Sequence, residues 1–515
     1  MKKTRKLSVL ALALLLAVSG LVGCGNSSSD KGSSTGSTST GSSGEAQTLD
    51  TSKEVELSMY FISNRPGKYD EIEDNFNKLF KEKLNCTLKT NWIAWSDYAN
   101  KYPLLFSSGE EFDLAYTATW LNFYSLAQKG AFMQLDELWP TYAPNNWAKT
   151  SETAKTQATV NGHLYCIPTL LATYSGYGPY YRVDCLEGTD WDGKMENFAD
   201  YEVYLDYIKE NTSLTPYSTG SQGSELDDTW HLANEKYNIR GTQWLYVDLN
   251  EDHYTLRTWY QDPGVMEFLT TMKRWADKGF WSPSVLSDTE ADKLKNGLDA
   301  STCHNIDSFT GVYIDAQRQG NGYEWHYANF NKDISPLPYT QDACVISTTS
   351  KNPERALALY DYITTDEEAF RAFYYGIEGT SYEIIDGQVQ ALNTDNYGFS
   401  SLWAARGEFT LDEVGYPQEA VDIKKGWDEE IAKKGNTGSA YLAGWTPDTT
   451  SVETEYAACT NVVQQYWWPL ELGLTNDVEG SLAEFQEKME AAGIDKVLEV
   501  FQKQLDEYCA NTPEG

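Results

Sequence analysis

The sequence predicts an α/β layer fold with mainly parallel sheets, because of alternating apolar patterns and the length of the chain. Apolar residues alternate with polar ones at 55–61, recur at helical spacing at 72–84, and alternate again at 86–92. This order is that of a β-α-β unit, which places its strands in a parallel sheet covered by helices. The 515 residues exceed what a single core usually contains, so two or three domains are expected.

The alternation continues along the chain, predicts a second α/β lobe in the middle third, and gives way to a helical pair at the C-terminal end. The further elements expected from these patterns are helices at 98–106, 121–129, 200–211, 265–279 and 482–508, and strands at 112–118 and 244–249. Strands and helices that alternate in both halves indicate two layered lobes.

The N-terminal end has the pattern of an exported, lipid-anchored protein. Basic residues precede an apolar run at 7–18, which suits a secretion signal and is too short to span a membrane. The following Leu-Val-Gly-Cys resembles the lipobox of bacterial lipoproteins, which implies a signal peptide at 1–23 and a lipid on Cys24. Residues 24–50 are mostly Ser, Gly and Thr and are expected to be a flexible tether. We therefore expect the protein at the outer face of the cell membrane.

Composition and motifs exclude several classes of function. A net charge of −36 opposes binding to nucleic acid and to anionic lipid head groups. The five His have no zinc spacing, the Asp248-x-Asn250-x-Asp252 run lacks the Gly and Glu of a calcium loop, and no phosphate-binding Gly loop is present. We expect no metal, no cofactor and no catalytic residues. The seven Cys other than Cys24 are expected to be mostly buried free thiols.

Several stretches, in a characteristic order, resemble family 1 extracellular solute-binding proteins, the sugar receptors of bacterial ABC importers. They include Leu-Leu-Phe-Ser-Ser-Gly-Glu-Glu-Phe-Asp-Leu at 104–114 and an Asn-Pro-Glu-Arg-Ala run at 352–356. The other matching stretches lie at 129–138, 160–168, 375–382 and 492–497. The resemblance implies a two-lobe fold of the type II periplasmic-binding-protein class, with a ligand cleft between the lobes.

The resemblance also implies an organisation and a function. Lobe 1 is expected at 51–172 with 345–390, lobe 2 at 173–344 with parts of 391–470, and C-terminal helices at 471–515. The implied function is capture of a carbohydrate, of oligosaccharide size, and its delivery to ABC transporter permease subunits in the membrane. The protein is expected to act as a monomer.

The expected ligand site combines aromatic rings with polar side chains, because a pyranose has an apolar C–H face and a hydroxyl rim. Ligands of open α/β sheets lie beyond the carboxyl ends of the strands. Residues after predicted strands, at the first crossing between lobes, and in later loops that the resemblance places at the ligand are therefore the candidates. They are Asn64, Arg65, Trp120, Tyr174, Tyr177, Asp307, Glu378 and Trp403. Gly176 and Gly178 are expected to permit hinge torsions.

Three alternatives remain open from the sequence, and one of them is a structural or adhesive surface lipoprotein. A peptide receptor of the same fold requires a wide polar cleft in place of stacked rings. A secreted glycoside hydrolase requires two carboxylates about 5–9.5 Å apart, and 76 acidic residues offer too many pairs to choose from.

Overall fold

The computed structural model describes most of the chain after the tether. It covers residues 49–514 except 96, 187, 189–190, 192–193, 221–224, 240–241, 243, 289–291 and 398–402. The expected signal peptide, the lipidation site Cys24 and almost all of the tether lie outside the described residues. Over the described residues, none of the helices combines the length and the apolar character that crossing a bilayer requires.

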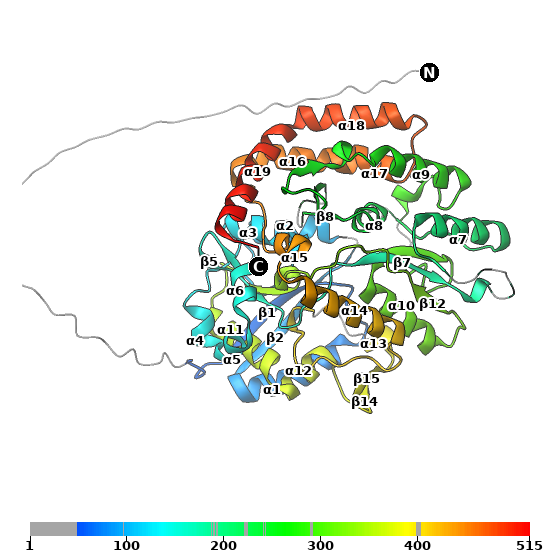
Figure 1. Ribbon diagram of the computed structural model, residues 1–515. Helices are drawn as coiled ribbons and strands as arrows, with labels where there is room; N and C mark the ends of the chain where they lie inside the picture. The colour runs from blue at the N-terminus through cyan, green and yellow to red at the C-terminus, as the bar shows by residue number, and fades with distance from the viewer. Residues whose placement is uncertain are drawn as a thin grey trace, which may run out of the picture. The chain divides into compact units, whose positions relative to one another are not determined.

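The first sheet has five strands in the order β2-β1-β3-β13-β6, and Figure 1 labels two of them, β1 and β2. They are β1 (Val55–Ile62), β2 (Cys86–Ile93), β3 (Leu114–Thr117), β6 (Ile167–Pro168) and β13 (Ala343–Ile346). The β1 strand is parallel to β2 and to β3, as the first β-α-β pattern predicts. The β13 strand is antiparallel to both β3 and β6, and the chain re-enters this sheet only after it has formed the second part of the molecule.

Helices and two small hairpins surround this sheet. The helices are α1 (Tyr69–Leu84), α2 (Tyr98–Ser107), α3 (Phe123–Gln128), α4 (Leu138–Tyr142), α5 (Pro144–Lys149), α6 (Glu152–Gln157), α11 (Pro353–Thr365), α12 (Glu367–Tyr374) and α13 (Thr394–Tyr397). The hairpins join β4 (Thr159–Val160) to β5 (His163–Leu164) and β14 (Tyr382–Ile385) to β15 (Gln388–Ala391). One continuous core contains the buried side chains of 57–167 and of 343–405.

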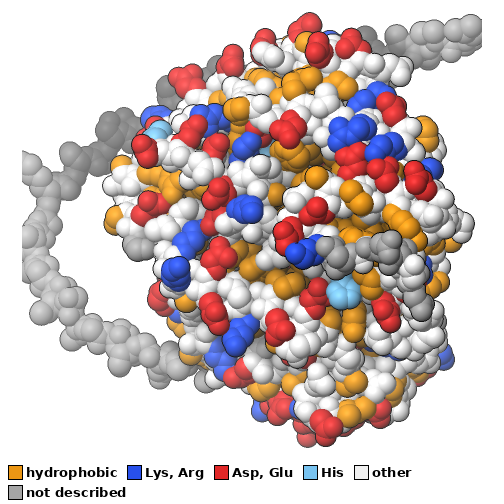
Figure 2. All heavy atoms as spheres, turned by 45° about the vertical axis from the view of Figure 1, so that its right-hand side comes forward, with side chains coloured by type: hydrophobic (Ala, Val, Ile, Leu, Met, Phe, Trp, Pro, Cys, Tyr) orange, Lys and Arg blue, Asp and Glu red, His pale blue; other side chains and the backbone are white. Residues whose placement is uncertain are grey.

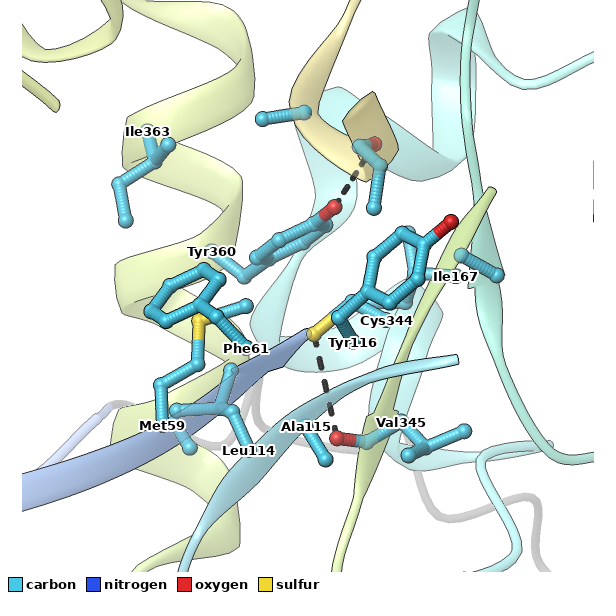
Figure 3. Packing of buried hydrophobic residues seen from close by; sticks show 14 of the residues in the cluster. Met59, Phe61, Leu114, Ala115, Tyr116, Ile167, Cys344, Val345, Tyr360 and Ile363 are labelled. Carbon is cyan, nitrogen blue, oxygen red and sulfur yellow. Dashed lines mark hydrogen bonds between the residues drawn. The ribbon is translucent and has the colours of Figure 1, made fainter. Parts of the chain in front are cut away.

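Figure 3 shows the centre of this core. Contacts there hold in place the segment that begins at Trp403, one of the predicted site residues. Tyr116 on β3 lies opposite Cys344 on β13, and Ile167 on β6 lies on the other side of Cys344. The buried hydroxyl of Tyr360, on α11, donates to the carbonyl oxygen of Ala404 at 2.8 Å. This bond anchors the segment that begins at Trp403 against the sheet.

The second part of the described chain has antiparallel pairing, so the expectation of mainly parallel sheets is wrong there. Its sheets are β11 (Ser301–Asn305), β7 (Tyr177–Arg182) and β12 (Trp325–Tyr327), and β10 (Leu256–Thr258), β9 (Leu245–Asp248) and β8 (Lys236–Asn238), in those orders. The β11-α10-β12 unit does produce two parallel strands, but β7 lies between them and runs opposite to both. A pattern along the chain does not reveal such an inserted strand.

Helices complete this second part, and those predicted at 200–211, 265–279 and 482–508 are confirmed. They are α7 (Phe198–Asn211), α8 (Leu226–Ala233), α9 (Val265–Lys278), α10 (Ile306–Gln319), α14 (Gln418–Lys434), α15 (Gly438–Leu442), α16 (Glu453–Val462), α17 (Trp468–Glu471), α18 (Val478–Ala492) and α19 (Ile494–Asn511). The last two form the expected pair and pack with α9 and α16 in one core (Figure 1). A smaller core lies between β7, α10 and α14.

The cysteines agree with the prediction of free thiols. All seven Cys in the described residues are unpaired, and five of them are buried. Burial raises the pKa of the Cys86 thiol to about 11, so this side chain packs as a neutral apolar group.

Candidate functional site

Strand register brings several loops to one edge of the five-stranded sheet. Ile62 at the end of β1 pairs with Ile93 at the end of β2, and Thr117 at the end of β3 pairs with Ala343 at the start of β13. The residues just beyond these positions therefore lie at the same edge, where α/β sheets bind ligands. They are Asn64 after β1, Trp95 after β2, Trp120 after β3, and Asp342 before β13.

Three indole rings form an aromatic cluster at this edge, hereafter the tryptophan cluster of Trp95, Trp120 and Trp403. The Trp95 ring lies 6.0 Å from that of Trp120, nearly parallel at 27°, and 6.0 Å from that of Trp403 at 36°. Trp95 is 37% exposed, and the other two are half-buried. Tyr98 and Tyr116 support the cluster with edge-on contacts to Trp120 at 5.6 Å and to Trp403 at 6.1 Å. The cluster is thus a partly exposed aromatic surface held by buried rings.

Polar groups lie directly beside the rings. Asp342 accepts hydrogen bonds from the Tyr116 hydroxyl and from the Arg406 guanidinium, both at 2.7 Å. Burial opposes the charge of Arg406, but the carboxylate of Asp342 raises the pKa of Arg406 above its usual value. Arg406 also donates to the carbonyl oxygen of Trp403 at 3.3 Å. This ion pair therefore fixes the loop that carries one ring of the cluster.

The chain crosses from the first sheet to the second between β6 and β7, where Tyr174 and Tyr177 were expected. This crossing runs beside a returning segment, with Ser175 N–H donating to the carbonyl oxygen of Ser335 at 2.9 Å and Leu337 N–H donating to that of Thr173 at 2.7 Å. The Tyr174 hydroxyl donates to Asp428 at 2.6 Å. The two paired crossings form a hinge of the kind that joins lobes.

The two glycines of this crossing are required for close packing, and neither has a positive φ. A Cβ on Gly176 would lie 2.7 Å from the ring of Trp427, and a Cβ on Gly178 would lie 2.2 Å from the carbonyl oxygen of Ala328. In this structure both glycines therefore have a steric role, because no side chain fits. That they also permit hinge torsions stays a prediction.

We expect Gly178→Ala to lower the free energy of unfolding by about 1–3 kcal/mol, because the new methyl group meets a backbone oxygen that cannot move alone. Gly311→Ala, on α10, is the matched control, since nothing lies within 4 Å of its added Cβ and alanine favours the helix. Urea unfolding followed by tryptophan fluorescence measures both variants. Equal unfolding midpoints for the two variants would contradict the steric argument.

A second group of polar and aromatic side chains lies at the hinge-side edge of the β11-β7-β12 sheet. Tyr177 starts β7, and its ring lies 5.5 Å from that of His304, whose pKa is lowered by burial. Asp307, in the first turn of α10, accepts a hydrogen bond from Lys424 of α14 at 2.6 Å. The Asp307 side chain is 45% exposed, and the partial loss of water around it would raise its pKa, but the cations of Lys424 and Arg406 hold the pKa below its usual value.

The positive charge of Arg406 contributes to the lowered pKa of Asp307, so the two side chains lie within electrostatic range of each other. A second link involves Tyr98. Burial raises the pKa of its hydroxyl, and the negative charge of Glu225, next to α8, raises this pKa further. The structure therefore brings Trp120, Trp403 and Asp307 toward one region, next to the crossing that carries Tyr174 and Tyr177.

The remaining predicted site residues, Asn64, Arg65 and Glu378, have other surroundings. Asn64 is exposed at the edge, while the neighbouring guanidinium of Arg65 contacts Asp70 at 2.5 Å and Glu73 at 3.5 Å. Glu378 is exposed in the turn after α12, where it forms a β-bridge with Tyr382, so its recorded contacts are local. Ligand contact by any of the eight candidates stays a prediction.

Sequence reasoning missed four residues of this region, namely Trp95, Asp342, Arg406 and Lys424. The signal for Trp95 was available, because it follows the predicted strand at 86–92 as Trp120 follows the strand at 112–118. The two ion pairs join residues 64 and 117 positions apart, and no local pattern links such partners.

Two other hollows are less suited to a sugar. A surface hollow of about 430 Å³ on α9 is lined by Lys273, Arg274 and Lys278 without any aromatic ring, and these cations already bind Asp277, Glu202 and Asp206. An enclosed hollow beside Trp467 has room for only about 10 Å³, roughly one water molecule. The tryptophan cluster therefore remains the best candidate.

Comparisons with known proteins agree with this architecture. A Streptococcus pneumoniae serotype 4 protein named carbohydrate ABC transporter substrate-binding protein is 27% identical over 530 residues, covering 99% of this chain and 100% of that protein. The N-glycan transport solute-binding protein NgtS from S. pneumoniae, solved with Man1GlcNAc, has a TM-score of 0.72 at 22% identity, covering 88% of this chain and 99% of that one. FusA from S. pneumoniae, solved with kestose, has a TM-score of 0.61 at 13% identity, covering 89% and 100%.

These structural likenesses confirm the predicted two-lobe α/β class. A family model described as a domain of unknown function, DUF3502, matches residues 441–510, which run from α15 into α19. The model described as bacterial extracellular solute-binding protein matches residues 65–370, more than half of the chain. The chain therefore belongs to the bacterial extracellular solute-binding protein family.

Proposed function

We propose that this protein captures a carbohydrate of oligosaccharide size and delivers it to the membrane permease of an ABC importer. The observation that carries the proposal is the tryptophan cluster, because partly exposed indole faces about 6 Å apart match the apolar faces of sugar rings. The names of the similar proteins support it, since they describe carriers of carbohydrate or complexes with glycans. None of the three is named as an enzyme, which supports a binding role.

The proposed mechanism is closure about the hinge. A sugar that stacks on the tryptophan cluster in lobe 1 and accepts hydrogen bonds from lobe 2 stabilises the arrangement in which both lobes contact it. Lobe 1 comprises 51–172 with 345–390, and lobe 2 comprises 173–344 with parts of 391–470. The separate cores support two lobes, and the larger core of lobe 2 also includes the helices of 471–515. The core of lobe 1 extends beyond the proposed bounds to Ala405, and Trp403 packs against it.

The proposed site of action is the outer face of the cell membrane. Cleavage after residue 23 and a lipid on Cys24 would hold the protein there, with 24–50 as tether and the protein acting as a monomer. The membership in an extracellular family supports this location. The binding role requires no cofactor and no metal.

A thermal-shift screen of the chain from residue 25 onward tests the proposal. Neutral oligosaccharides, monosaccharides and short peptides are compared with buffer alone, and a ligand of the folded state raises the unfolding midpoint. We expect a shift with at least one oligosaccharide and intact sugar on recovery by chromatography. Binding of peptides alone, or shortened glycan products, would overturn the proposal.

A further inference from the structure

Among the residues that the structure describes, the cations at the two sheet edges, Arg406 and Lys424, are each neutralised by a carboxylate. Arg406 binds Asp342 at 2.7 Å, and its guanidinium is 15% exposed. Lys424 binds Asp307 at 2.6 Å and also contacts the Tyr416 hydroxyl at 2.7 Å. On the molecular face that Figure 2 shows, basic side chains likewise lie beside acidic ones.

This pairing determines which charges the site accepts. A uronate or sialate carboxylate needs a cation that is free to bind it, because a buried anion without a partner is strongly disfavoured. Here it would have to displace Asp307 or Asp342, whose own charge would then repel it. Asp428, which accepts from Tyr174, adds negative charge next to the crossing.

A positively charged amino sugar is not favoured either. Asp342 already accepts two hydrogen bonds, from Tyr116 and Arg406, and Asp307 is paired with Lys424. Asp428 is exposed, so water and the Tyr174 hydroxyl solvate its charge. None of these carboxylates gains much from a further cation.

We propose that the ligand is an uncharged oligosaccharide and that Asp307 and Asp342 determine this specificity by neutralising Lys424 and Arg406. The inference rests on the proposed function and narrows it to one class of glycan. The two carboxylates would thus exclude anionic sugars through unfavourable contacts, rather than select neutral sugars through additional attractive contacts.

Isothermal titration with matched sugars tests this inference. Mannotriose is compared with trimannuronate, and the N-acetylglucosamine dimer with the glucosamine dimer, so that charge changes while ring number stays the same. For whichever neutral probe binds, we expect its charged counterpart to bind at least about a hundredfold more weakly. Equal or tighter binding of the charged counterpart overturns the inference and leaves sugar binding intact. If no neutral or charged sugar binds, either among these pairs or among the oligosaccharides of the thermal-shift screen, the proposed function itself fails.

Asp307→Asn tests the role of the ion pair. Its side chain is 45% exposed, so the variant should fold, and Lys424 would be left as a cation without its carboxylate. We expect the preference for the neutral sugar over its uronate to fall by about tenfold. Asp315→Asn, further along α10 and paired with Lys295 and Arg318, is the control and should leave the preference unchanged. An unchanged preference in Asp307→Asn, with folding verified by circular dichroism, overturns the assignment of Asp307.

Discussion

Replacing Trp120 or Trp403 by alanine is expected to weaken sugar binding about a hundredfold, while the protein still folds. Each ring is half-buried and contributes one face of the tryptophan cluster, and removal of such an anchor commonly costs about 2–4 kcal/mol of binding free energy. Trp120→Phe retains a flat ring at the same place and should lose less than about tenfold. Isothermal titration with a sugar found by the thermal-shift screen measures all three variants.

Trp147→Ala is the matched control for these variants. Trp147 is also half-buried and aromatic, but it packs on Trp139 at 5.0 Å in the α4–α5 region, away from the sheet edge. Its loss should reduce stability and leave the dissociation constant unchanged. If Trp120→Ala and Trp403→Ala both bind the sugar as tightly as the unmodified chain does, the cluster is not the site.

Arg406→Met is expected to lower the free energy of unfolding by about 3–5 kcal/mol, because it leaves the carboxylate of Asp342 buried without its cation. Asp342 is 5% exposed, and the Tyr116 hydroxyl alone cannot balance its charge. The variant also frees the Trp403 loop, so weaker sugar binding should accompany the loss of stability. Urea unfolding measures the first effect, and titration of the same sample measures the second.

A double variant separates the buried charge from the lost contacts. Adding Asp342→Asn removes the uncompensated charge, so the double variant should be more stable than Arg406→Met alone. Lys101→Met is the control for loss of an exposed pair: Lys101 is 64% exposed beside Asp97, and such pairs contribute about 0–1 kcal/mol. If Arg406→Met is no less stable than Lys101→Met, the ion pair with Asp342 has no structural role.

Local patterns predicted the elements of this fold better than their arrangement. The strand expected at 244–249 is present as β9, and the helix expected at 265–279 is present as α9, because their apolar periodicities reflect burial on one face. The strand at 112–118 is shorter than expected. The prediction of parallel pairing failed for β7, because the neighbouring strands come from residues more than a hundred positions later in the chain.

The candidate site was predictable to the extent that strand ends determine it. Trp120 follows a strand with a clear pattern, and its place at the sheet edge needed only the rule for α/β ligand sites. Asp342 and Arg406 could not be found this way, because their importance comes from a contact between distant segments. The motif around Glu378 fixed its sequence position, and the structure places it in an exposed turn, where ligand contact stays a prediction.

The position of β13 has a consequence for how the chain matures. The strand at 343–346 is inserted between β3 and β6, and Asp361 on the following helix accepts hydrogen bonds from the backbone N–H of Asn146 and the amide group of Asn145, both at 2.7 Å. A ribosome must therefore release 178 further residues after β6, those at 169–346, before the sheet that begins the protein is complete. Contacts so far apart in sequence form slowly. For most of its synthesis the polypeptide therefore has an incomplete first sheet. In that state it stays unfolded enough to pass through a narrow channel.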